Sequence, residues 1–152
     1  MNNTRQSTLV AIPTDKERAF ILSHRVARMA TADKSGRPLV VPICYAYDDR
    51  CFYTPIDKKP KRVSVMGLKR VRNISENPNV SVVIDEYHED WTRLFYVIIH
   101  GRAELIEKGE EYLNSLRLLC EKYPQYKDMN LSKLNMPVIK IVPDRITSWG
   151  AV

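Results

Sequence analysis

The sequence predicts a mainly β protein, a six-stranded antiparallel barrel with α-helices packed outside it. Three β-rich segments follow one another within about thirty residues, and three more occur later in the chain. This spacing is typical of an all-β barrel or sandwich and differs from that of βαβ units. The 152 residues and the 44% hydrophobic fraction suit one globular domain. We therefore expect a single domain over residues 1–152, with residues 1–13 as a surface arm.

A helix and a three-stranded meander are expected first. Thr14 and Glu17 have the spacing of a capping box, which predicts a short helix ending at about Arg25. Pro42 cannot donate a backbone hydrogen bond, so it marks an edge, a bulge or an opening of the sheet. The strands and the turns between them are expected at residues 26–32, 33–36, 39–45, 48–50 and 51–54.

The second half alternates helices and strands. Leu68, Val71 and Ile74 recur at helical spacing, and the Asn77-Pro78 pair ends this helix. Three further strands are expected at residues 80–85, 94–105 and 137–142. Between the last two, residues 110–122 form an amphipathic helix whose apolar face carries Tyr112, Leu113, Leu116, Leu119 and Cys120.

Bulk composition favours a cytoplasmic protein. The longest apolar run, Leu94–Ile99, is far shorter than the roughly 20 residues that cross a bilayer. The first residues lack the apolar segment of a signal peptide. Cys44, Cys51 and Cys120 are odd in number and unevenly spaced, which argues against a disulfide framework.

Positive charge is concentrated in one segment, residues 58–72. Seven of the 24 basic residues lie there without an intervening acid, and the other 17 are balanced by 18 acidic residues. Such a local cluster favours recognition of a defined anionic group over general affinity for polyanions. The first part of the cluster contains Lys58, Lys59, Lys61 and Arg62, and the second contains Lys69, Arg70 and Arg72.

Three interpretations of this basic segment are open. It could be a solvated surface, as charge runs usually are. Nucleic-acid binding would require interleaved exposed aromatic residues, whereas Val63, Val65, Met66 and Leu68 have the character of core residues. The preferred interpretation is a phosphate site between a strand end and a helix start, because a helix N-terminus offers free N–H groups and partial positive charge.

Hydrolytic and metal sites find little support in the sequence. His24, His88 and His100 are scattered, and the cysteines form no CxxC pair. Neither a nucleophile elbow nor a glycine-rich phosphate loop is present. The acidic residues near His88 fit a solvated hairpin loop, so no metal site is expected.

The order of the motifs resembles the pyridoxamine-phosphate-oxidase-like superfamily of flavin-binding split barrels, over about residues 15–150. Within it, the likeness is greatest to the branch of coenzyme F420-dependent oxidoreductases. The superfamily resemblance rests on Phe52-Tyr53-Thr54, the Lys58–Arg62 run and Asn73-Ile74-x-x-Asn77-Pro78. The branch resemblance rests on Asp57-x-Lys59-Pro60-Lys61, Asp90–Leu94, Gly101-Arg102-Ala103, Lys122–Tyr126 and Ile146-Thr147-x-Trp149.

The resemblance implies a homodimer with two cofactors in clefts between the subunits. It implies that the cofactor phosphate is held by Tyr53, Thr54, Lys58, Lys59, Lys61 and Arg62. The strand Val41-Pro42-Ile43 would offer backbone groups to the cofactor ring. Pyridoxamine-phosphate oxidases carry further basic residues in that strand, where this chain is apolar, so their reaction is not expected here.

The expected function is therefore hydride transfer between F420 and a small organic substrate, with FMN as the alternative cofactor. A flavin reductase and a non-catalytic cofactor carrier are the rival functions, and no membrane association is expected. Trp91 and Trp149 are expected in the core or a dimer interface; Trp149 is the better candidate for a wall of the cofactor cleft. No catalytic residue is assigned, although Tyr45 and Tyr87 are possible proton donors.

Overall fold

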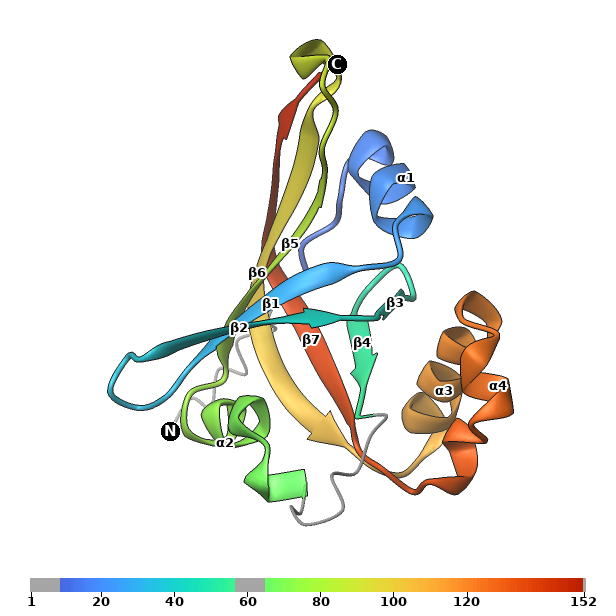
Figure 1. The fold of residues 1–152 in the computed structure, drawn as a ribbon. Helices are drawn as coiled ribbons and strands as arrows, with labels where there is room; N and C mark the ends of the chain where they lie inside the picture. The colour runs from blue at the N-terminus through green and yellow to red at the C-terminus, as the bar shows by residue number, and fades with distance from the viewer. Residues whose placement is uncertain (1–8, 57–64, 152) are drawn as a thin grey trace, which may run out of the picture.

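The computed structural model describes residues 9–56 and 65–151, and it confirms the antiparallel, mainly β architecture (Figure 1). The described strands form one curled sheet in the order β2-β1-β5-β6-β7-β4-β3, a split barrel. The strands are β1 (Ala27–Ala32), β2 (Pro38–Ile43), β3 (Ala46–Tyr47), β4 (Phe52–Pro55), β5 (Asn79–Glu86), β6 (Phe95–Ile106) and β7 (Val138–Gly150).

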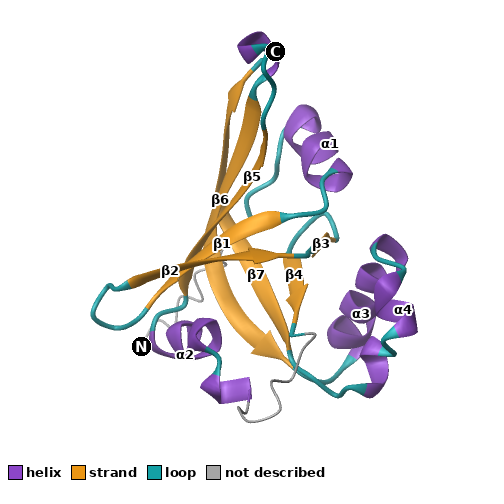
Figure 2. Cartoon of the chain, viewed as in Figure 1, coloured by secondary structure: helices purple, strands orange, loops and turns teal. Residues whose placement is uncertain are grey.

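Helices lie around the outside of this sheet (Figure 2). The predicted capping box is present at the first of them, because the Glu17 N–H donates to the Thr14 hydroxyl and the Thr14 N–H donates to the Glu17 carboxylate. The α-helices are α1 (Asp15–Ser23), α2 (Lys69–Glu76), α3 (Glu110–Lys122) and α4 (Gln125–Asp128). Three 3₁₀ turns are η1 (Val65–Gly67), η2 (Trp91–Arg93) and η3 (Leu131–Lys133).

The long pair β6 and β7 forms the centre of the sheet and bends at one point. Their register shifts between His100 and Gly101, where β7 contains an extra residue. A Cβ at Gly101 would lie 2.5 Å from the Val142 carbonyl oxygen, so only glycine allows the two backbones to approach this closely. This bend lets the sheet curl around its core.

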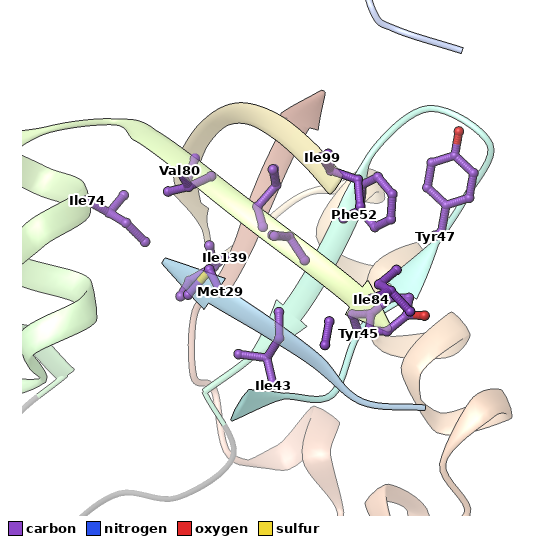
Figure 3. Close-up of a cluster of buried hydrophobic side chains, with 14 of the residues drawn as sticks. Met29, Ile43, Tyr45, Tyr47, Phe52, Ile74, Val80, Ile84, Ile99 and Ile139 are labelled. Carbon is purple, nitrogen blue, oxygen red and sulfur yellow. The ribbon is translucent and has the colours of Figure 1, made fainter. Parts of the chain in front are cut away.

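Two hydrophobic clusters stabilise the fold. The larger fills the inside of the curled sheet, and Figure 3 shows Met29, Ile84 and Ile99 converging there from three strands. The smaller lies between the other face of β4 and α3, and contains Tyr53, Tyr112 and Leu119. Alternate residues of β5 and β6 point into the larger cluster, as period-2 patterning requires.

The structure corrects several element predictions. The strand predicted at residues 39–45 ends at Ile43, and the short β3 follows it, so the described residues contain seven strands rather than six. The last strand continues to Gly150, well beyond the expected end at residue 142. On α3, Leu113 is 63% exposed, although its spacing predicted a buried position.

The predicted three-stranded meander is also wrong, although its first hairpin is present. β2 pairs with β1, but β4 pairs with β7 at the other end of the sheet. The reason lies in the prolines of β2. Pro38 and Pro42 lack an N–H, so they remove two donors from the side of β2 that a third meander strand would have joined.

The described residues contain no helix that is long and apolar enough to cross a membrane.

Hydrogen exchange tests the orientation of β2. The Asp33 N–H donates to the Arg37 carbonyl at 3.1 Å, and the same register pairs Met29 with Val41 and Ala30 with Val40. Hydrogen-bonded and non-hydrogen-bonded pairs alternate in an antiparallel ladder, so Val41 bonds to β1 and Val40 faces outward. We expect the Val41 amide to exchange slowly and the Val40 amide to exchange quickly in residue-resolved NMR of the ligand-free protein. The opposite order would reverse this assignment.

Candidate functional site

The candidate site is the opening between the two ends of the sheet. β2 is the last strand at one end, and β3 and β4 form the other end. Among the described strands, β2 pairs only with β1, so the barrel does not close. An open strand edge presents a row of backbone donors and acceptors, which can bind a ligand or another strand.

The open edge of β2 is rich in acceptors and poor in donors. The backbone groups of Pro38, Val40 and Pro42 point away from β1, toward the open edge. Those of Val41 and Ile43 point toward β1 and bond to it. Because proline has no N–H, this edge offers three carbonyl groups and a single N–H, that of Val40. Of the predicted ring-contacting residues, Pro42 therefore points its backbone group into the opening, whereas the backbone groups of Val41 and Ile43 point into the sheet.

The inner face of β2 packs in the same cluster as residues on either side of Lys58–Arg62, the first group of cations in the basic segment. Ile43 is buried in this cluster, and Val41 packs against it. Ile56 precedes the segment and is fully buried there, while Val65 and Leu68 lie within the segment, between its two groups of cations, and pack against the same core. The predicted phosphate ligands Lys58, Lys59, Lys61 and Arg62 lie outside the described residues.

The predicted ligands Tyr53 and Thr54 stand at the end of β4, with both side chains buried. The Tyr53 hydroxyl faces α3, where it donates to Glu111 at 2.9 Å and to Asp48 at 3.0 Å. Burial, followed by these carboxylates, raises the pKa of Tyr53. Its phenol is therefore part of the support behind β4, and the strand itself is paired with β3 and β7, Tyr53 opposite Ala46 and Thr54 opposite Ile139.

Helix α2 is connected to the hairpin of β1 and β2 by polar contacts to the buried side chains of Asp33 and Thr31. Asp33, 3% exposed, accepts from the Arg37 guanidinium at 2.8 Å, and its carboxylate lies 3.7 Å from the Lys69 ammonium. The amide of Asn73 donates to the buried Thr31 hydroxyl at 3.0 Å. The helix itself begins at Lys69, and its N-cap residue Leu68 offers no side-chain cap, so the N–H groups at the start of the helix remain available to an anion.

Trp149 lies away from these elements in a single protomer. It stands near the end of β7, at the opposite end of the molecule from α2 (Figure 1). Its ring stacks on Tyr96 with centroids 5.7 Å apart and remains 57% exposed. Trp91 is 71% exposed, so neither tryptophan belongs to the core of the protomer.

The remaining polar candidates do not form a catalytic or metal centre. The phenol of Tyr45 is buried and donates to the Ile21 carbonyl at 2.6 Å, so it is not available as a proton donor. His24 and His88 both contact Glu86, at 3.2 and 3.1 Å. Within residues 9–56 and 65–151, no group of three or more potential ligands could hold a metal ion.

Comparison with known proteins places this geometry in a family. The model of the pyridoxamine 5′-phosphate oxidase family matches residues 13–150. The chain belongs to the pyridoxamine 5′-phosphate oxidase family.

Proteins similar to this chain differ in function. A 5a,11a-dehydrotetracycline/5a,11a-dehydrooxytetracycline reductase from Streptomyces rimosus is 27% identical over 139 residues, which are 90% of this chain and 82% of the relative. A FAD-binding protein from Mesorhizobium loti has a TM-score of 0.68 at 23% identity, over 92% of this chain and 95% of that one. The heme storage protein HutZ from Vibrio cholerae has a TM-score of 0.71 at 18% identity, over the same shares. The two solved structures establish the shared fold, which does not by itself select a ligand.

The sequence alone did not predict the roles of three residues, Val40, Asp33 and Asn73. Val40 carries the one outward N–H of β2, and the alternation between Pro38 and Pro42 could have revealed it. Asp33 was read only as a turn residue, and Asn73 only as part of a motif. Their long-range partners, Lys69 and Thr31, are separated from them by tens of residues, so no local pattern indicates these contacts.

The stability of this protein against unfolding at low pH should depend on Asp33. Hydrogen bonds from Arg37 lower the pKa of this carboxyl from 3.8 to about 2. A lowered carboxyl pKa stabilises the folded state above about pH 4, and this contribution is lost as pH falls toward 2. Asp33→Asn should lower the urea midpoint at pH 7, and the difference from wild type should shrink between pH 4 and 2. Asp128→Asn, at an exposed position, is the control. A difference that stays constant with pH would contradict the assignment.

Proposed function

We propose that this protein is an oxidoreductase that binds a phosphorylated flavin or deazaflavin, preferably F420, and transfers hydride to or from a small organic substrate. The observation that carries the proposal is the open edge of β2 beside a core cluster that also holds residues on either side of Lys58–Arg62. A ring with amide groups can pair with such an edge, while the adjacent cations neutralise its phosphate.

The phosphate end would be held by Lys58, Lys59, Lys61 and Arg62, next to the strand end that carries Tyr53 and Thr54, and by the uncapped start of α2. These residues fit a phosphate because a strand end, the cations of residues 58–62 and the free N–H groups at the start of α2 occur in this order within fifteen residues, Pro55 to Lys69. Each charge-assisted hydrogen bond contributes about 1.5–3 kcal/mol, so a few of them suffice to anchor the cofactor.

The bound cofactor would supply the hydride chemistry. The residues of this chain would position the ring along Val40 and Pro42, neutralise its phosphate and exclude water from the opening. A reaction carried by the cofactor needs neither a metal site nor a catalytic residue of the protein. The described part of the chain contains no group of potential metal ligands, and no catalytic residue is assigned.

Two observations favour a deazaflavin with a longer acidic tail. Arg70 and Arg72 extend the positive charge along α2. The motifs around Lys59, Trp91 and Trp149 resemble the F420-dependent branch of the family. Similarity to the dehydrotetracycline reductase from S. rimosus supports a reductive role on an organic molecule.

A homodimer would complete the site. Trp149 lies at the far end of one protomer, so only a second protomer could bring it to the β2 opening. The exposed Tyr96–Trp149 stack provides a flat apolar surface with one N–H donor for this purpose. A cytoplasmic location and a small-molecule substrate complete the proposal.

Cofactor titration tests the central claim. We expect the purified protein to bind oxidised F420 with a dissociation constant below the tens-of-micromolar range, and FMN more weakly, in fluorescence titrations. FMN that co-purifies as a yellow colour would favour the flavin reductase alternative. Failure of both cofactors to bind in that range would overturn the proposal.

Two matched double variants test the phosphate site. Lys58→Ala with Lys59→Ala should weaken F420 binding at least tenfold, because each lost charge-assisted bond contributes about 1.5–3 kcal/mol. Lys127→Ala with Lys133→Ala removes two exposed cations elsewhere and should leave binding unchanged. Wild-type affinity in the first double variant would mean that the phosphate lies elsewhere.

A nucleic-acid-binding role is separable by its salt dependence. Seven neutralised phosphates would give a slope near −6 for log affinity against log salt, at about −0.9 per contact. We expect single- and double-stranded DNA and RNA to bind weakly, without this slope. A steep slope with tight binding would favour the non-catalytic alternative.

A further inference from the structure

The backbone of β2 also bears on the choice between the two cofactors, an inference that rests on the proposed function. We infer that Pro42 selects a 5-deazaflavin ring against an oxidised flavin ring, because it removes the backbone donor that the flavin N5 atom would require. This makes Pro42 a specificity-determining residue that acts through a missing hydrogen bond.

The register of β2 fixes which backbone groups face the opening. Asp33 and Arg37 form a hydrogen-bonded pair, so residues two, four and six positions beyond Arg37 bond to β1. The intervening residues Pro38, Val40 and Pro42 face outward. Outward positions recur about every 6.6–6.8 Å along a strand, so a planar ring that lies over Val40 and Pro42 does not extend to Pro38.

The occupant of this edge is not another strand. A strand that joins an edge needs the N–H groups of alternate residues, and two of the three outward residues here are prolines. A long ladder therefore cannot form. The three carbonyls and the single Val40 N–H instead suit a ligand that donates more hydrogen bonds to this edge than it accepts.

The two candidate cofactors differ in this respect at the central ring. Position 5 of an oxidised flavin is a nitrogen with an accepting lone pair, whereas position 5 of a deazaflavin is a carbon that bears hydrogen. Both rings carry carbonyl oxygens on the pyrimidine, and one of these can accept from Val40. A flavin then retains a second acceptor without a donor, and an acceptor removed from water without a partner weakens binding.

Of the two prolines, Pro42 is the one expected to meet the cofactor ring, because its neighbours in β2 pack beside the residue that precedes the proposed phosphate site. Val41 and Ile43 both contact the cluster that contains Ile56, the last described residue before the basic segment. Pro38 lies four residues away, roughly 13 Å along an extended strand, beside the turn of the β1–β2 hairpin. It therefore provides a matched control with the same parity and the same residue type.

The test compares Pro42→Ala with Pro38→Ala in titrations with oxidised FMN and oxidised F420. Pro42→Ala restores an N–H in the opening, so FMN should bind roughly two- to twelvefold more tightly, the range of one neutral hydrogen bond. F420 affinity should stay within about twofold of wild type. Pro38→Ala should change neither affinity, and thermal denaturation of both variants controls for the small loss of stability expected from replacing proline.

Each other outcome is decisive. Equal tightening of FMN in both variants, tightening of F420 together with FMN, or no change in FMN binding would overturn the role of Pro42. The last of these results, obtained with wild-type F420 binding intact, would leave the proposed function standing. Binding of neither cofactor to any variant would overturn the function and this inference together.

Discussion

The missing N–H groups of Pro38 and Pro42 are the constraint on which the open barrel depends. A curled antiparallel sheet tends to close because an unpaired strand edge is an exposed row of donors and acceptors. In this protein the edge of β2 retains its carbonyls but loses two of three donors, so neither β4 nor a foreign strand gains much by pairing with it. The sheet stays open at this line, and the bare acceptors become available to a small ligand.

Polar contacts, in addition to hydrophobic packing, fix the position of α2 relative to the β1–β2 hairpin beside the opening. Asp33 closes the β1–β2 hairpin through Arg37 and reaches Lys69 on α2, while Asn73 of the same helix donates to Thr31 of β1. The Asn73–Thr31 pair is buried and the Asp33 carboxylate is buried against two exposed cations, so these polar groups favour the one geometry in which each keeps its partner. Here they fix the position of α2, and with it the end of the basic segment, relative to β2.

Sequence reasoning recovered what local patterns encode and missed what depends on pairing. The capping box of Thr14 and Glu17 and the stop at Asn77-Pro78 gave α1 and α2 nearly to the residue. The prediction of a three-stranded meander was wrong because the partner of a strand depends on the whole sheet, and β4 pairs with β7. At the site, Pro42 was correctly interpreted as an edge signal, and the family was identified. The role of Tyr53 was not accessible, because the contact of its phenol with Glu111 depends on where α3 packs.

If Trp149 contributes to the β2 opening as proposed, it must come from a second protomer, because in one protomer the two lie far apart. A cofactor ring at an open edge would be held on one side by backbone carbonyls and would face water on the other. In one protomer the exposed aromatic stack of Tyr96 and Trp149 lies at the far end of the β6–β7 ribbon. Small pockets bind well when they bury most of the ligand surface, which a single strand edge cannot do. An arrangement in which the ribbon of one copy covers the opening of another would supply the missing wall and exclude water, and both are needed for hydride transfer without loss to solvent.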